Sequence, residues 1–228
     1  MIKSVLVTGA SSGIGRDVVR QLCARGLAVV ATGRDAERLA ALRQETGCYA
    51  ASFDLSQPEA PAELYAAARA ALGGPPDALV NNAGFNRRKG PVTDITAVEL
   101  DAHMAVNFRA AALLCREAMR DMMTRKAGHI INVVSTVVWH KAEHYSVYCA
   151  SKCALHGFTA CLIKEARPHG IKVTGVYPGG TDTPFRALER PDYMKSESAA
   201  RMIVDTLFVP DDVVVHELTF RPMVETNF

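Results

Sequence analysis

The chain has 228 residues, of which 49% are hydrophobic and 22% are charged, and its formal net charge is +2. This length suits one domain with a substantial buried core, and the composition is that of an ordinary globular protein rather than a disordered one. The small net charge, without a long Lys/Arg run, gives no indication of nucleic-acid binding.

Short β-branched runs and longer helical patterns alternate along the whole chain. They are predicted in this order: strand 2–7, helix 13–25, strand 27–32, helix 35–46, strand 48–53, helix 58–72, strand 77–80, helix 96–126, strand 129–134, helix 146–167, strand 171–177, helix 196–207 and strand 213–220. Short links between such elements require right-handed crossovers. We therefore expect an α/β fold: a Rossmann-type, doubly wound parallel sheet of about seven strands with helices on both faces. Without repeats or linkers, residues 1–228 are predicted to form one domain.

The six cysteines form no CxxC pair and no histidine stands at metal-ligand spacing, so no metal site is expected. Cys149 and Cys153 are one helical turn apart, which we interpret as two free thiols rather than a site. Residues 1–7 pass directly into a glycine-rich loop, which leaves no room for a signal peptide, and no apolar run is long enough to cross a bilayer. These features predict a cytoplasmic protein with reduced thiols and no membrane association.

Gly9, Gly13 and Gly15 lie between the first strand and the first helix. Glycine permits a tight turn and lets the backbone approach a pyrophosphate, while the helix directs its unpaired N–H groups at the phosphates. A glycine-rich turn alone is common in α/β proteins. The strand before it and the helix after it favour a nucleotide site.

The residue after the second strand indicates which dinucleotide binds. A carboxylate there would bind the ribose hydroxyl of NAD, whereas an arginine accommodates the 2′-phosphate of NADP. The chain has Arg34 at this point, and Asp35, one residue later, is interpreted as the N-cap of the helix that follows. We therefore predict NADP(H), with NAD(H) as the alternative.

Tyr148 and Lys152 stand four residues apart on a predicted helix, thirteen residues after Ser135. A phenol has a pKa of about 10, and a drop of three units needs roughly 4 kcal/mol of differential stabilisation. The ammonium of Lys152, on the same helical face, favours the phenolate and so lowers the pKa of Tyr148. The pair predicts proton exchange with an alcohol or carbonyl oxygen, although an isolated pair of this kind is usually an ordinary helix-face contact.

Taken together, these motifs resemble those of the short-chain dehydrogenase/reductase family. The resemblance extends along almost the whole chain, through segments 8–15, 54–55, 81–84, 148–152 and 178–183 with Asn107 and Ser135 between them. It implies that Tyr148 is the general acid or base and that Ser135 binds the substrate oxygen. It also implies that Lys152 holds the nicotinamide ribose and that Asn107 holds a water of a proton relay. Asn107 read alone is a polar residue at a helix kink, and Ser135 the last residue of a strand.

The same resemblance implies a set of cofactor contacts. Asp54 would accept from the adenine amino group, Leu55 would contribute a backbone contact, and Thr183 would bind the nicotinamide carboxamide. Asn81 has a structural alternative, in which its side chain ties neighbouring strands together. The full predicted cofactor set is Gly9, Ser11, Ser12, Gly13, Ile14, Gly15, Arg34, Asp54, Leu55, Asn81, Ala83, Gly84, Tyr148, Lys152, Pro178, Gly179, Thr181 and Thr183.

The substrate is expected over Ser135 and Tyr148, between segments 85–93, 137–147 and 184–195. The substrate loop of about 183–196 is shorter than the lid that the family often carries, so the pocket would be open or its lid reduced. Arg87, Arg88 and Lys89 would bind an acidic group there or remain solvated. The sequence thus predicts an oxidoreductase acting on a small carbonyl or secondary alcohol, either a ketone reductase or a hydroxy-acid dehydrogenase. The alternatives are a 3-oxoacyl-carrier reductase and a non-catalytic NADP(H) sensor. The family resemblance also implies a homodimer or homotetramer.

Overall fold

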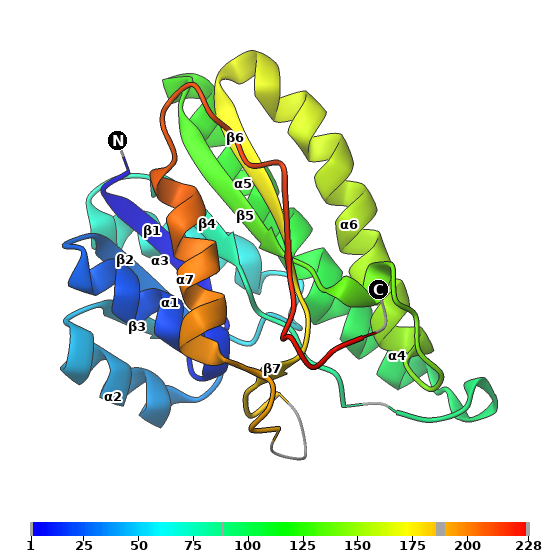
Figure 1. The fold of residues 1–228 in the computed structure, drawn as a ribbon. Helices are drawn as coiled ribbons and strands as arrows, with labels where there is room; N and C mark the ends of the chain where they lie inside the picture. Colours follow the sequence, from blue (N-terminus) through cyan, green and yellow to red (C-terminus); the bar gives the residue numbers. More distant parts are fainter. Residues whose placement is uncertain (1, 88, 186–189, 227–228) are drawn as a thin grey trace.

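The computed structural model describes residues 2–87, 89–185 and 190–226 (Figure 1). Seven parallel strands form one sheet in the order β3-β2-β1-β4-β5-β6-β9. The strand order runs outward from β1 on one side and from β4 on the other, so it reverses between these two strands. This order confirms the predicted Rossmann-type sheet. The strands are β1 (Ser4–Thr8), β2 (Ala28–Gly33), β3 (Tyr49–Ser52), β4 (Ala78–Asn81), β5 (Gly128–Val133), β6 (Ile171–Pro178) and β9 (Glu217–Phe220).

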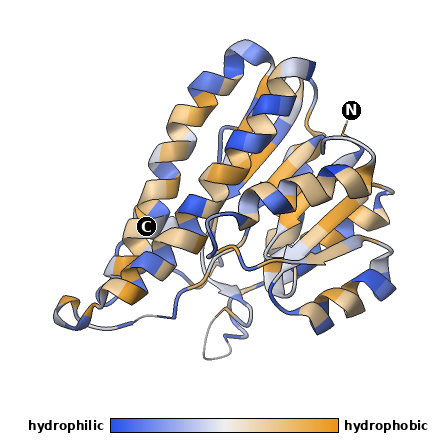
Figure 2. Ribbon diagram, turned by 180° about the vertical axis from the view of Figure 1, so that it is seen from behind, coloured by the Kyte–Doolittle hydropathy of each residue, from blue (hydrophilic) through white to orange (hydrophobic). Residues whose placement is uncertain are grey.

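Helices cover both faces of the sheet, and each face has its own apolar core (Figures 1 and 2). On one face, Val18 and Ile203 belong to the core under α1, α2 and α7; on the other, Leu64 and Leu114 belong to the core under α3, α5 and α6. Strands buried on both sides have the near-continuous apolar sequences seen here. The helices are α1 (Gly13–Ala24), α2 (Ala36–Thr46), α3 (Ala60–Leu72), α4 (Ala97–Met104), α5 (Ala110–Arg125), α6 (Ser146–Ala166) and α7 (Ser196–Asp205).

Three predicted elements need correction. The helix expected over 96–126 is divided by a π-helical segment, η2 (Ala105–Arg109), between α4 and α5. The last strand begins at residue 217 rather than 213, because only four residues pair with β6. A small parallel pair, β7 (Thr181–Asp182) and β8 (Met194–Lys195), was not predicted. Strand propensity does not reveal whether a partner strand is present, and apolar periodicity does not reveal a π turn.

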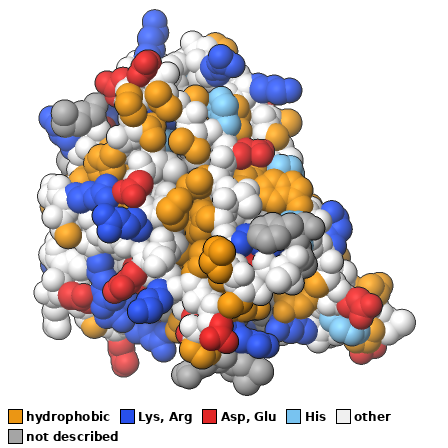
Figure 3. Space-filling model, in the orientation of Figure 1, with side chains coloured by type: hydrophobic (Ala, Val, Ile, Leu, Met, Phe, Trp, Pro, Cys, Tyr) orange, Lys and Arg blue, Asp and Glu red, His pale blue; other side chains and the backbone are white. Residues whose placement is uncertain are grey.

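The surface carries interspersed charges of both signs on the face shown in Figure 3. Several are paired: Arg25 of α1 lies 2.6 Å from Asp205 of α7, and Arg20 lies 2.7 Å from Glu45 of α2. Of the helices that the structure describes, none is both long and apolar enough to cross a membrane.

A buried histidine in β5 makes stability depend on pH. His129 is 2% exposed, its Nε2 lies 2.8 Å from the Thr174 hydroxyl oxygen, and burial lowers its pKa to about 4. The unfolded chain binds this proton more tightly than the folded chain, so stability falls as the pH drops from about 6.5 towards 4. We expect this group to remove up to about 3 kcal/mol from the free energy of unfolding over that interval.

The measurement is urea unfolding of the wild type and of His129→Gln at about pH 7 and pH 4.5. The substituted protein should lose less stability on acidification than the wild type. His169→Gln, in the turn after α6, is the matched control and should behave like the wild type. If the His129 variant lost as much free energy of unfolding on acidification as the wild type, His129 would not be the cause of the pH dependence.

Candidate active site

The glycine loop joins β1 to α1 at the carboxyl edge of the sheet. Gly9 has a φ of 68°, and a Cβ there would lie 2.8 Å from the Cα of Ala83. A Cβ on Gly15 would overlap with the Gly9 carbonyl oxygen. The loop can therefore form only if both positions lack a side chain. The hydroxyl of Ser12 does not cap α1, so the N–H groups of its first turn can serve an anion.

Two residues that the sequence reasoning missed hold this loop in place. The Asn82 side-chain amide donates to the carbonyl oxygens of Thr8 and Gly9, at 3.0 and 3.3 Å. The Thr8 hydroxyl oxygen accepts from the backbone N–H groups of Asn82 and Ala83, both at 3.0 Å. The signal was present in the sequence, since Asn82 follows directly after a buried strand. The 81–84 turn is thus fixed to the glycine loop.

Arg34 and Asp54 come together where β2 and β3 end. The pKa of Asp54 lies below its usual value because the Ser56 backbone N–H donates to the carboxylate at 3.0 Å, and the positive charge of Arg34 adds to this effect. Both side chains are exposed. A cationic and an anionic group are therefore available at the edge where a dinucleotide would place its adenosine.

Asp35 caps the helix that follows β2. Its carboxylate accepts from the backbone N–H of Arg38 at 3.0 Å and caps α2, as predicted. Ser11 lies close to Gly33, since a Cβ on that glycine would lie 2.9 Å from the Ser11 hydroxyl oxygen. The glycine loop therefore packs against the end of β2.

The predicted cluster of cations divides in the structure. Arg87 lines a cavity of about 260 Å³ together with Arg34 and Phe85, on the side of α4. The Lys89 ammonium lies 5.1 Å from the centroid of the Tyr145 ring, whereas Arg88 lies outside the described residues. Arg87 thus shares a cavity with the predicted phosphate ligand.

Lys152 is buried between α6 and β5. It is 3% exposed, and its ammonium donates to the Val133 carbonyl oxygen at 2.8 Å. A Cβ on Gly84 would lie 3.4 Å from the Lys152 Nζ and 3.2 Å from the Asn107 Oδ1, so the three residues meet. Burial lowers the pKa of Lys152 to about 8. The ammonium nevertheless holds its proton in most molecules at pH 7.

Asn107 lies in the π-helical segment and is fully buried. Its side chain binds the backbone of Phe85 twice: Oδ1 accepts from the N–H at 2.9 Å, and Nδ2 donates to the carbonyl oxygen at 3.0 Å. Nδ2 also donates to the Ser151 hydroxyl, 3.0 Å away. A π turn often marks a functional position, because it shifts the hydrogen-bonding register of the helix. Here it places Asn107 beside Lys152.

Ser135 follows the end of β5, and Tyr148 lies in the first turn of α6. The Ser135 hydroxyl oxygen accepts from the Val137 N–H at 3.2 Å, at the start of the turn η3 (Thr136–Val138). Tyr148 is 8% exposed, and its ring lies edge-on to Phe185, with the ring centroids 5.8 Å apart. Tyr148 and Lys152 both belong to the buried face of α6.

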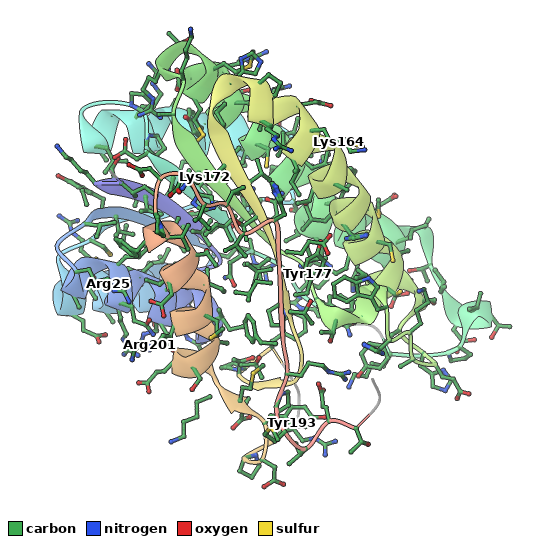
Figure 4. All side chains as sticks on the ribbon, turned by 45° about the horizontal axis from the view of Figure 1, so that its top comes forward. Arg25, Lys164, Lys172, Tyr177, Tyr193 and Arg201 are labelled. Carbon is green, nitrogen blue, oxygen red and sulfur yellow. The ribbon has the colours of Figure 1, made fainter. Side chains whose placement is uncertain are left out.

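The segment after β6 passes over the glycine loop. A Cβ on Gly13 would lie 3.1 Å from the Thr183 Cβ, and the Thr181 hydroxyl donates to the Gly179 carbonyl oxygen at 3.2 Å. Tyr193 packs below this segment, where a Cβ on Gly180 would overlap its ring (Figure 4). Of the predicted contact residues in 178–183, Thr183 thus lies next to the glycine loop, whereas 186–189 lie outside the described residues.

Asn81 and Leu55 are buried away from this surface. The Asn81 side chain donates to the Asn132 Oδ1 at 2.9 Å, and the Asn132 amide donates to the Thr159 hydroxyl, also at 2.9 Å. The network joins β4, β5 and α6, which is the structural alternative given above for Asn81. Leu55 is 5% exposed and belongs to the core.

These residues fit a dinucleotide. The glycine loop has no room for side chains, the first turn of α1 can bind a pyrophosphate, and Arg34 with Asp54 stands where the adenosine half would lie. Within the described part of the chain, no three His, Cys, Asp or Glu side chains are grouped so that they could hold a metal ion.

Comparison with known proteins agrees with this geometry. The family model for short chain dehydrogenases matches residues 3–194. An uncharacterized oxidoreductase of Staphylococcus aureus (strain MW2) is 31% identical over an alignment of 227 positions, and the match covers 97% of each chain.

Two solved structures are similar over nearly the whole chain. The closed form of serine dehydrogenase complexed with NADP+ has a TM-score of 0.90 and 26% identity, covering 98% of this chain and 96% of that one. A metagenomic short-chain oxidoreductase in complex with NADP has a TM-score of 0.86 and 33% identity, covering 98% of both. The chain therefore belongs to the short-chain dehydrogenase/reductase family and is an NAD(P)(H)-dependent oxidoreductase.

Proposed function

We propose that the protein transfers a hydride between NADP(H) and a small carbonyl or secondary alcohol. One observation carries the proposal: Lys152 and Asn107 meet at Gly84, on a turn that is hydrogen-bonded to the glycine loop. Proton-handling groups and a dinucleotide cradle thus adjoin each other. In the proposal the site residues are those predicted from the sequence. Leu55 contributes a backbone contact to the cofactor, and Asn81 acts by joining the strands.

The cofactor, when bound, supplies or accepts the hydride. Tyr148 gives its hydroxyl proton to the substrate oxygen during reduction and takes it back during oxidation. Ser135 steadies the same oxygen. Because its hydroxyl oxygen already accepts from Val137, its own proton is left to donate to the substrate.

Lys152 keeps a positive charge close to Tyr148 and so favours the phenolate. It is anchored by the Val133 carbonyl oxygen, so the charge has a defined position. We further propose that Asn107 holds a water that connects Lys152 to solvent. Its side-chain amide is engaged by Phe85 and Ser151, so we assign this water to its main-chain carbonyl, in the π-helical segment.

NADP(H) is favoured over NAD(H) by charge. Arg34 offers a cation at the end of β2, and Asp35, the nearest carboxylate in sequence, is occupied as a helix cap. The similar serine dehydrogenase and metagenomic oxidoreductase were solved with NADP.

A small hydroxy acid and its oxo acid form the substrate class best supported. The likeness to serine dehydrogenase covers 98% of this chain, and Phe185 forms an aromatic wall beside Tyr148. A 3-oxoacyl group on a carrier protein is the second candidate, because Lys89 is exposed beside the loop that carries Tyr145. We also propose a cytoplasmic homodimer or homotetramer.

The test is a fluorescence titration of the purified protein with NADPH and NADH, followed by a panel of small ketones, 3-oxo acids and 3-oxoacyl thioesters. We expect tighter binding of NADPH and its oxidation by one small-molecule class. Turnover with carrier-linked thioesters alone would favour the second candidate. Tight NADPH binding without turnover on any member would support a sensor and contradict the proposed reaction.

A further inference from the structure

Two thiols face each other on α6, one position beyond each of the two catalytic candidates. Cys149 follows Tyr148 and Cys153 follows Lys152, and the two sulfur atoms are 3.9 Å apart. Both side chains are half-buried, so they can be reached from solvent. Both are free thiols, as predicted, and the fold of α6 brings their sulfur atoms together.

A direct disulfide does not suit this pair. Residues i and i+4 of a helix have Cβ atoms about 5–6 Å apart, whereas a disulfide needs about 3.5–4.5 Å. Closing the bond would therefore distort α6 at Tyr148 and Lys152. An atom that bridges the two sulfurs fits better, because two bonds through a central atom keep the sulfurs well apart and do not draw the Cβ atoms to disulfide distance.

The number of protein ligands indicates which kind of atom could bind between the two sulfurs. Structural zinc takes four protein ligands, and the described part of the chain groups no three His, Cys, Asp or Glu side chains that could hold a metal ion. A trivalent organoarsenical needs only two sulfurs, since its third bond is to its own carbon. We propose that Cys149 and Cys153 form a dithiol site for a trivalent arsenic centre.

The reaction requires no oxidant. An arsine oxide, R–As=O, combines with two Cys–SH groups to give R–As(S–Cys)2 and one molecule of water. Two As–S bonds form, while two S–H bonds and the As=O bond break. Both thiol protons and the oxygen leave as the water, and arsenic remains trivalent. Burial and the neighbouring Cys153 thiol raise the pKa of Cys149, and the Lys141 ammonium offsets only part of this effect.

Arsenic binding to Cys149 would change the contacts of the turn that follows Ser135. The Cys149 thiol donates to the Val137 carbonyl oxygen at 3.5 Å, and the Val137 N–H donates to the Ser135 hydroxyl. A sulfur bound to arsenic has no proton to donate, so the contact between α6 and η3 is lost. Trp139, the single tryptophan of the chain, ends this turn and is 41% exposed. It therefore reports on the site without any assay of activity.

The experiment is a titration of the purified protein with phenylarsine oxide, followed by Trp139 fluorescence and by intact-mass spectrometry. We expect the fluorescence change to saturate at one equivalent. The bound arsenical should resist an excess of a monothiol and be removed by a 1,2-dithiol. Only a chelating pair of thiols can compete with the two As–S bonds to the protein.

Matched variants locate the site. Cys149→Ser and Cys153→Ser should each abolish the monothiol-resistant adduct, with far-UV circular dichroism confirming the fold. Cys161→Ser, an exposed cysteine on the same helix, should bind like the wild type. Cys23→Ser tests the other neighbouring pair, Cys23 and Cys48, and should also bind normally. A resistant adduct that survives in either α6 variant, disappears in Cys23→Ser or never forms in the wild type would overturn the proposal.

Discussion

Replacing Tyr148 by Phe is expected to lower kcat by a factor on the order of 10²–10⁴ while NADPH still binds. The hydroxyl is the proposed proton donor, and the ring, which packs against Phe185, is retained. The measurement combines steady-state turnover of whichever substrate is active with a fluorescence titration of the cofactor. A loss confined to kcat is the signature of a group that acts in the transition state.

Tyr49→Phe provides the matched control, because Tyr49 is an exposed tyrosine on β3, at the far edge of the sheet. It should leave both turnover and NADPH binding unchanged. If Tyr148→Phe kept most of the activity, another group must supply the proton. If it lost NADPH binding, Tyr148 would be a cofactor ligand first.

Replacing Arg34 by Asp is expected to change the preference from NADPH to NADH. A hydrogen bond to a charged group contributes about 1.5–3 kcal/mol, which corresponds to a factor of about 10–100 in affinity. The new carboxylate would add repulsion of the 2′-phosphate and could accept from the ribose hydroxyl of NADH. The measurement is kcat/KM and dissociation constants for both cofactors.

Arg43→Asp makes the same change of charge in the last turn of α2, away from the end of β2. It should leave the cofactor preference as it is. Unchanged preference in the Arg34 variant would contradict the 2′-phosphate assignment. The cavity that Arg87 shares with Arg34 would then make Arg87 the next residue to test.

The alternation of elements and the family motifs were readable from local patterns. Strand runs such as 2–7 and the glycines at 9, 13 and 15 are short-range signals, because burial on both faces and tight turns leave their mark on neighbouring residues. The Asp35 cap was predicted for the same reason. The parallel sheet followed from the connections, since short strand–helix links permit few topologies.

Interactions between residues distant in the chain were decided only by the tertiary structure. The binding of Asn82 to the carbonyl oxygens of Thr8 and Gly9 spans more than seventy residues, and no local pattern encodes such a pairing. Helical periodicity predicted an unbroken helix around Asn107. The structure instead has a π-helical segment there, in which the Asn107 side chain is hydrogen-bonded to Phe85 and Ser151.

The sequence by itself determined the fold class and the cofactor class and supplied the residues proposed for the site, because each of these depends on short motifs and their order. The tertiary structure decided which side chains meet. Burial at the end of β5 lowers the pKa of Lys152, and the turn of α6 brings Cys149 to 3.9 Å from Cys153. Side-chain burial and the distances between side chains depend on how the helices pack on the sheet, so they exist only in the folded protein.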